Sequence, residues 1–131
     1  MYSIVTSDLI PIDQLVLFLK QYFKTDNVYN ACDLESYPAV APDNIISYMY
    51  YEYDESESNF PLMIEVYTKD DVTQKLELDF AQSLAQKYCC NCIFDDRDST
   101  YTWLMVNSHG SIIKMSEYNG RFTIYDDTDD T

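Results

Sequence analysis

The stretch NCIFDDRDSTYTWLMVNSHGSIIKMSEYNGRFTIYD, residues 91–126, alternates apolar and aromatic side chains with polar ones in short runs separated by turn residues. The runs are Cys92–Phe94, Tyr101–Val106, Ile112–Met115 and Phe122–Tyr125. Asn119 and Gly120 supply the positive φ angles that a two-residue hairpin needs, and Ser108–Gly110 can serve the turn before it. We therefore predict a four-strand antiparallel meander, in which the loop 95–100 and the turn 118–120 lie at the same end.

The first third of the chain predicts a helix between a short strand and a loop. A possible first strand covers Tyr2–Val5. In Pro11–Phe23 the apolar side chains recur at helical spacing behind a proline, which suits the first turn of a helix. The segment Thr25–Asp43 is polar, contains two prolines and has no clear period, so it indicates a loop with a possible helical turn at Cys32–Glu35.

Two strands and a second helix are expected between the first helix and the meander. The strands are Ile45–Tyr53 and Phe60–Thr68, and one face of the second strand should carry Phe60, Leu62, Ile64 and Val66. Asp79, with Gln82 three residues later, resembles a capping box and predicts a helix over Asp79–Tyr88. The pattern leaves open whether Leu76–Leu78 is strand or helix.

Together these elements predict one α+β domain over residues 1–131. Its mostly antiparallel sheet consists of the C-terminal meander and two earlier strands, with two main helices packed on one face. The pattern does not decide whether the earlier strands join the meander in one sheet. The acidic tail, residues 126–131, has no apolar side chain to bury and is expected to fray.

The composition favours a folded acidic protein with a basic partner. Hydrophobic residues make up 47% of the chain and aromatic residues 15%, which argues for a core in spite of a net charge of −15. The 23 acidic side chains against 8 basic ones repel nucleic-acid phosphates and anionic membranes and attract basic proteins. Solubility alone also explains acidity in many proteins. We expect a basic protein partner, no direct contact with nucleic acid or membrane, and a monomer or weak homodimer.

The start of the chain and its cysteines favour a cytoplasmic location. Met1–Leu9 lacks the basic start of a secretory signal, and no apolar run approaches the roughly 20 residues that span a bilayer. In a reducing compartment the four cysteines should remain free thiols rather than form disulfides. They are Cys32, Cys89, Cys90 and Cys92.

Motifs for metal or nucleotide chemistry are weak. Cys89–Cys92 has a C-x-x-C spacing that Cys32 and His109 would complete as a zinc site, but a second cysteine pair or a histidine pair is absent. The chain has only 2 glycines, which excludes a glycine-rich phosphate loop. Because 23 acids make close carboxylate pairs inevitable, such pairs carry no catalytic signal. We expect no cofactor, no metal and no enzymatic activity.

Two acidic clusters interleaved with tyrosines are the candidate binding residues. Tyrosine offers a large contact area at little conformational cost, and carboxylates accept hydrogen bonds from Arg and Lys. Solvated strand ends beside half-buried tyrosines are the simpler alternative for each cluster. The residues that we expect to contact a basic partner are Tyr51, Tyr53, Asp54, Glu55, Glu57, Asp95, Asp96, Asp98 and Tyr118.

The order of elements from Phe80 onward carries a family resemblance. An amphipathic helix precedes a strand ending in Asp95-Asp96, the aromatic strand Tyr101–Val106, the turn Ser108–Gly110 and two apolar strands. With the size and acidity, this order resembles the small immunity proteins of bacterial polymorphic-toxin and contact-dependent growth inhibition systems. The resemblance implies a cytoplasmic protein that neutralises a cognate toxin domain, often a nuclease, by covering its active site or a neighbouring surface.

Two other functions stay open at this point. A phage-encoded acidic protein could mimic nucleic acid and so block a host defence nuclease, and its charge and size would be similar. A small hydrolase that uses carboxylates would instead place acids with raised pKa values in a deep pocket.

Overall fold

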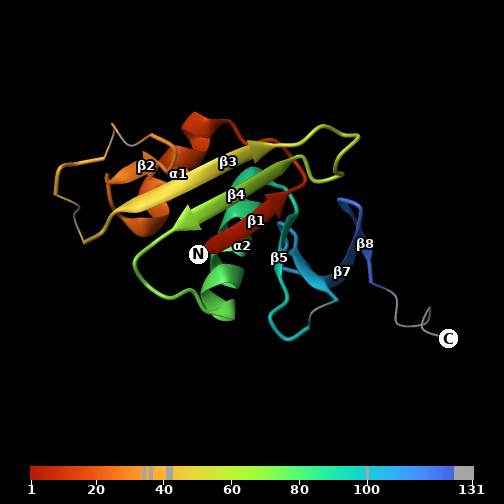
Figure 1. Ribbon diagram of the computed structural model, residues 1–131. Helices are drawn as coiled ribbons and strands as arrows, with labels where there is room; N and C mark the ends of the chain where they lie inside the picture. Colours follow the sequence, from red (N-terminus) through yellow and green to blue (C-terminus); the bar gives the residue numbers. More distant parts are fainter. Residues whose placement is uncertain (34, 36, 41–42, 100, 126–131) are drawn as a thin grey trace.

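The computed structural model describes residues 1–33, 35, 37–40, 43–99 and 101–125, and within them one eight-stranded sheet carries two helices (Figure 1). The strands are β1 (Tyr2–Thr6), β2 (Val28–Asn30), β3 (Ile46–Glu52), β4 (Leu62–Tyr67), β5 (Cys92–Asp95), β6 (Trp103–Val106), β7 (Ile112–Tyr118) and β8 (Arg121–Ile124). The helices are α1 (Ile12–Phe23) and α2 (Gln74–Tyr88). The order across the sheet is β2-β3-β4-β1-β5-β6-β7-β8, and among the strands of the described residues only β2 and β3 run parallel. The predicted α+β class with a mainly antiparallel sheet and a C-terminal meander is confirmed.

Strand β1 joins the two halves of the sheet. It pairs with β4 along its whole length, from Tyr2 opposite Val66 to Thr6 opposite Leu62. On its other side Val5 and Thr6 pair with Ile93 and Cys92 of β5. The earlier strands and the meander therefore form one continuous sheet.

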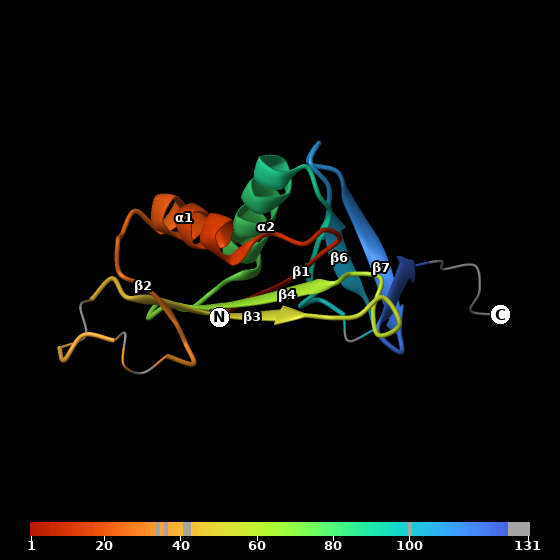
Figure 2. The ribbon, with the colours of Figure 1, turned by 90° about the horizontal axis from the view of Figure 1, so that it is seen from above.

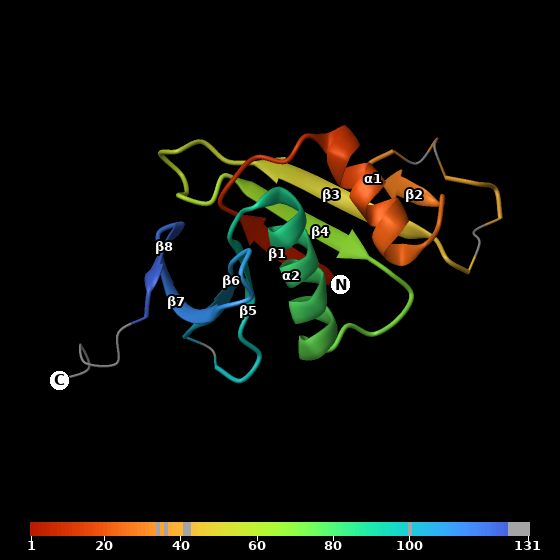
Figure 3. The ribbon, with the colours of Figure 1, turned by 180° about the vertical axis from the view of Figure 1, so that it is seen from behind.

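Both helices pack on one face of this sheet (Figures 2 and 3). The apolar stripes of α1 and α2 and every second residue of the central strands are removed from water together, which is the main stabilising term of the fold. Phe80 of α2 is at the centre of this core, with its ring 4.9 to 6.0 Å from the rings of Tyr2, Phe18, Tyr22 and Phe23. The fully buried members include Ile4, Leu15, Leu19, Leu62, Ile64, Val66, Phe80 and Leu84.

A second, smaller core lies on the opposite face, because the sheet bends. Figure 2 shows β6 and β7 turned out of the plane of β3 and β4. Ile93, Met105 and Met115 meet inside this bend, and Phe60 covers them from the β3–β4 loop. Phe60 was expected beside Leu62 on one face of a strand, and that expectation is wrong. The strand begins at Leu62, so the alternation does not extend back to Phe60.

Helix α2 begins earlier than the sequence indicated. Thr73 is its N-cap, and the Thr73 hydroxyl oxygen accepts a hydrogen bond from the Leu76 backbone N–H at 3.2 Å. Asp79 is therefore an interior residue rather than the cap, and Leu76–Leu78 is helical. The helical period was hidden because Glu77, a carboxylic acid, occupies a position on the buried stripe.

Strand β2 lies within the segment that was expected to be a loop. Its three residues are too few to show alternation, and they are held by parallel pairing with β3, where Val28 is opposite Ile46 and Asn30 opposite Tyr48. The expected helical turn at Cys32–Glu35 includes a residue outside the described part of the chain. The expected frayed tail, residues 126–131, lies wholly outside it.

Candidate functional site

The face of the sheet opposite the helices is only partly covered. In Figure 1, β1, β3 and β4 lie in front of both helices and present this face. We call it the open face and define it by the half-buried side chains Ser3, Val5, Ser47, Met49, Tyr51, Met63, Glu65 and Tyr67. The register places Tyr51 opposite Met63 and Met49 opposite Glu65. Alternation thus produces a surface rich in tyrosine and methionine, two residue types that are enriched at protein interfaces.

The phenols of the open face are held by their neighbours. Tyr67 donates a hydrogen bond to Glu65 Oε2 at 2.7 Å, and this bond raises the pKa of Tyr67 to about 12. The Tyr51 hydroxyl lies 3.2 Å from the Met49 sulfur. Partial burial and the Glu65 charge raise the pKa of Tyr51 as well. Both phenols are therefore neutral at physiological pH and are already oriented before any partner arrives.

The β3–β4 loop, which carries the first predicted cluster, docks against the β7–β8 hairpin. Asn59 donates to the Phe122 carbonyl at 2.8 Å and accepts from the Phe122 N–H at 2.9 Å. Arg121 donates from its guanidinium to the carbonyl oxygen of Glu55. Tyr118 projects from the same hairpin and is 79% exposed. The structure thus brings the β3–β4 loop against the hairpin that carries Tyr118, which lies more than 60 positions further along the chain.

A cavity of about 460 Å³ lies where the docked loop and hairpin meet the open face. This volume is within the range of roughly 300–1,000 Å³ found for ligand pockets. We call it the aromatic pocket; its lining is Ser3, Val5, Tyr53, Glu57, Ser58, Met63, Ile93, Trp103, Glu117, Asn119, Gly120 and Phe122. The Trp103 and Phe122 rings meet edge to face, with centroids 5.8 Å apart. Among the described residues, this lining contains two carboxylates and no basic side chain.

Both carboxylates of the aromatic pocket are positioned by backbone amides. Glu57 Oε1 accepts a hydrogen bond from the Asp54 N–H at 3.2 Å. Glu117 Oε1 accepts from the Gly120 N–H at 3.0 Å. Within the described residues, the second oxygen of each carboxylate makes no hydrogen bond. Each group therefore has an acceptor oxygen available to a ligand.

The second predicted cluster, Asp95, Asp96 and Asp98, lies at the end of β5 and in the β5–β6 loop, and its three residues differ in exposure. Asp95 and Asp98 are exposed, and Asp95 pairs in register with Trp103. Asp96 is only 4% exposed, and its carboxylate accepts from the Thr102 hydroxyl at 2.6 Å and the Asp98 N–H at 3.2 Å. Asp96 therefore shapes the loop, whereas Asp95 and Asp98 face solvent.

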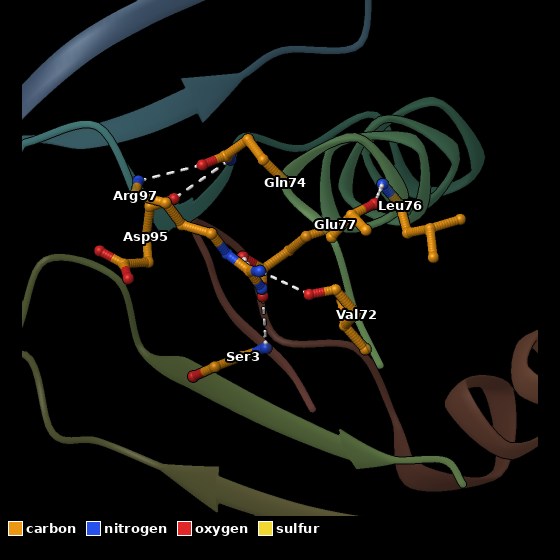
Figure 4. A network of polar contacts seen from close by, with 8 residues as sticks. Ser3, Val72, Gln74, Leu76, Glu77, Asp95 and Arg97 are labelled. Carbon is orange, nitrogen blue, oxygen red and sulfur yellow. Dashed lines mark hydrogen bonds and ion pairs between the residues drawn. The ribbon is translucent and has the colours of Figure 1, made fainter. Parts of the chain in front are cut away.

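A network of polar contacts around the buried Glu77, which the sequence did not indicate, joins this loop to α2 (Figure 4). Glu77 is 2% exposed; its Oε2 accepts from the Ser3 N–H at 3.0 Å, and its Oε1 lies 3.7 Å from the Arg97 guanidinium. Burial raises the pKa of Glu77, and the Ser3 hydrogen bond and the Arg97 charge partly offset that rise. Gln74 adds hydrogen bonds to the Asp95 carbonyl and the Arg97 N–H. This carboxyl with a raised pKa is thus bonded within the protein and does not line the aromatic pocket.

The cysteines and the histidine are not gathered at one place. Cys90 and Cys92 are buried with their sulfurs 3.9 Å apart, whereas Cys32 and Cys89 are exposed. His109 is exposed in the β6–β7 turn, where its backbone N–H donates to Asn107. A search of the described residues finds no group of three or more potential ligands placed to hold a metal ion.

Several pocket residues were missed by sequence reasoning, although a signal for them existed. Trp103, Glu117 and Phe122 lie on one face of the meander because the register places Trp103 opposite Met115 and Glu117 opposite Phe122. Period-two alternation alone would have placed them together. Their meeting with Tyr53 and Glu57 depends on loop docking, which has no local signature.

Comparison with models of known families, with curated proteins and with solved structures gives no match for this chain. Neither described helix combines the length and the apolar character needed to cross a membrane.

Proposed function

We propose that this chain is a cytoplasmic immunity protein that binds a basic toxin domain, most simply a nuclease, and blocks its access to substrate. The observation that carries the proposal is the convergence of aromatic rings and carboxylates around a pocket whose lining has no cation. A surface of this kind is complementary to the basic surface with which a nuclease holds phosphates. The proposal needs no cofactor and no enzymatic step, and one copy of the chain is sufficient.

Two effects act in succession on the encounter. The net charge of −15 attracts a cationic domain over distances comparable to the Debye length, which is about 8 Å at physiological ionic strength. Tyr51, Tyr53 and Tyr118 then lose water against the toxin, and the exposed acids of both loops accept hydrogen bonds from its Arg and Lys side chains. Those side chains would otherwise hold the phosphates of the substrate.

The direct test is a calorimetric titration of the purified protein with the C-terminal toxin domain encoded by the gene immediately upstream of its own. We expect saturable one-to-one binding that weakens as salt is raised, and inhibition of the toxin at the same stoichiometry. The variant Glu57→Lys/Asp95→Lys/Asp98→Lys should lose most of the affinity. Failure of the two proteins to bind, or an affinity indifferent to salt and to this variant, contradicts the proposal.

The matched control reverses charges on the helix-covered side. Asp13 of α1 and Asp79 of α2 are exposed there, away from the open face. Asp13→Lys/Asp79→Lys lowers the net negative charge by about four units, against about six for the triple variant, and leaves the proposed contact surface intact. It should reduce the rate of association modestly and change the rate of dissociation little.

A further inference from the structure

The aromatic pocket combines apolar walls with two negative charges, and neither a purely apolar ligand nor an anion is complementary to both. Its floor is apolar, with Val5, Met63 and Ile93, and Trp103 contributes an indole ring. Glu57 and Glu117 add two negative charges to the same lining. Both glutamates are exposed to solvent at the edge of the cavity, and an apolar occupant would leave their charges without a partner. An anion would be repelled by them.

We propose that the aromatic pocket is the binding site for a single arginine side chain presented by the partner. This inference rests on the proposed function and names the anchor residue of the interaction. A guanidinium is planar, so one face can stack on an aromatic ring while its edge donates to a carboxylate. The pocket supplies both kinds of group within one cavity, and this combination is what selects arginine.

Lysine fits the pocket less well for two reasons. Its ammonium group is compact and strongly hydrated, so it loses more solvation on entering an apolar cavity than a guanidinium does. It also lacks the planar fork of donors that pairs with the free oxygens of Glu57 and Glu117. The positioning of these carboxylates by the Asp54 and Gly120 amides favours the group whose own geometry is fixed.

The chain contains its own reporter of occupancy. Trp103 is the single tryptophan, so the protein gives one indole N–H signal in an NMR spectrum, and that signal comes from the pocket. The probes are N-acetyl-arginine amide and its neutral isostere N-acetyl-citrulline amide, titrated separately into the intact wild-type protein. We expect the arginine probe to shift the indole signal saturably, and the citrulline probe to bind at least roughly tenfold more weakly, since it loses the charge-assisted hydrogen bonds.

Two double variants distinguish the effect of the pocket carboxylates from the effect of the protein's overall negative charge. Glu57→Gln/Glu117→Gln removes both charges and keeps an acceptor oxygen for the Asp54 and Gly120 amides. The hydrogen bonds of Asn59 and Arg121 that dock the loop on the hairpin are untouched. This double variant should weaken the arginine probe by about tenfold. Asp13→Asn/Asp79→Asn removes the same charge from the helix-covered side and should leave the binding of the probe within about twofold.

Three results would overturn the assignment. The first is that the arginine probe does not shift the Trp103 signal. The second is that the arginine and citrulline probes bind equally well. The third is that both double variants weaken binding of the arginine probe to the same extent. The assay contains no toxin, so it fails independently of the proposed function. Binding of toxin with no binding of arginine refutes the pocket assignment alone, whereas binding of arginine with no toxin partner refutes the proposed function alone.

Discussion

The two faces of one sheet differ sharply in this protein. On the helix-covered face Ile4 and Ile64 are fully buried, and they belong to the same apolar core as Phe80 of α2. On the open face, Glu65 follows Ile64 in β4, and Tyr51 lies on the neighbouring strand β3. Both are half-buried and make polar contacts, Glu65 with the Tyr67 hydroxyl and Tyr51 with the Met49 sulfur. Because side chains alternate between the two faces of the sheet, the same strands serve two roles. One set of side chains stabilises the fold, and the other set remains available for binding.

Removing a large ring from the helix-covered face should have the largest effect on this comparison. Phe80→Ala is expected to lower the free energy of unfolding by about 3–5 kcal/mol, because it leaves a cavity among four aromatic rings. Tyr51→Ala on the open face is expected to cost less than about 1 kcal/mol and to weaken toxin binding instead. Urea unfolding measures the stability of both variants, and equal destabilisation by Phe80→Ala and Tyr51→Ala would contradict the division between the faces.

The docking of the β3–β4 loop should give an intermediate effect. Gly120 has φ 81°, and a Cβ there would overlap the carbonyl oxygen of Glu57. Gly120→Ala should therefore destabilise the protein by roughly 2 kcal/mol and shift the fluorescence of Trp103 as the pocket opens. The control is Gly110→Ala in the opposite turn, where φ is also positive, at 84°, but the nearest atom is the flexible amide of Gln82. A control that is destabilised as much as Gly120→Ala, with the same fluorescence change, would show that docking is not the cause.

The smallest expected effect concerns the ionisation of phenols on the two faces. The Glu65 hydrogen bond raises the pKa of Tyr67 from 10.0 to about 12, whereas burial raises the pKa of Tyr22 on the helix-covered side. Because the folded-state pKa of Tyr67 exceeds its unfolded value, its contribution to stability is complete below pH 10 and is lost as the pH rises toward 12.

Absorbance titration of tyrosinate measures this difference. Glu65→Gln should return the pKa of Tyr67 toward its ordinary value and leave that of Tyr22 unchanged. Tyr67→Phe identifies which step of the titration belongs to Tyr67. A Tyr67 step that does not move in Glu65→Gln would show that the carboxylate is not the cause of the shift.

Local patterns predicted the parts of the fold that local interactions stabilise. Helix α1, the meander and the Asn119-Gly120 turn all have the periodicity or the backbone requirement of their final structure, and each was placed to within a few residues. The start of α2 was missed because Glu77 interrupts the apolar stripe; it is tolerated there by Ser3 and Arg97, which are distant in sequence.

The candidate site was predicted only in part, for the same physical reason. Tyr53 and Glu57 were identified from composition, and both line the aromatic pocket, whereas Tyr118 belongs to the neighbouring hairpin and is not part of that lining. Their grouping with Trp103 depends on two hydrogen bonds between Asn59 and Phe122, residues 63 positions apart. A contact over that separation leaves no period and no turn signature in the sequence. Only the alternation that places Trp103 on the same face as Glu117 was available in advance.

The central position of β1 has a consequence for how the chain reaches this structure. Strands β3 and β4 can form a hairpin, and β5 to β8 can form a meander, from neighbouring segments alone. Tyr2–Thr6 precedes both of its neighbours in the sheet along the chain, because β4 and β5 come from later segments. Assembly should therefore be limited by insertion of this strand between two preformed halves, a step of high contact order. A protein without residues 1–7 should remain in two loosely associated halves, and a synthetic peptide of those residues should restore the sheet in trans.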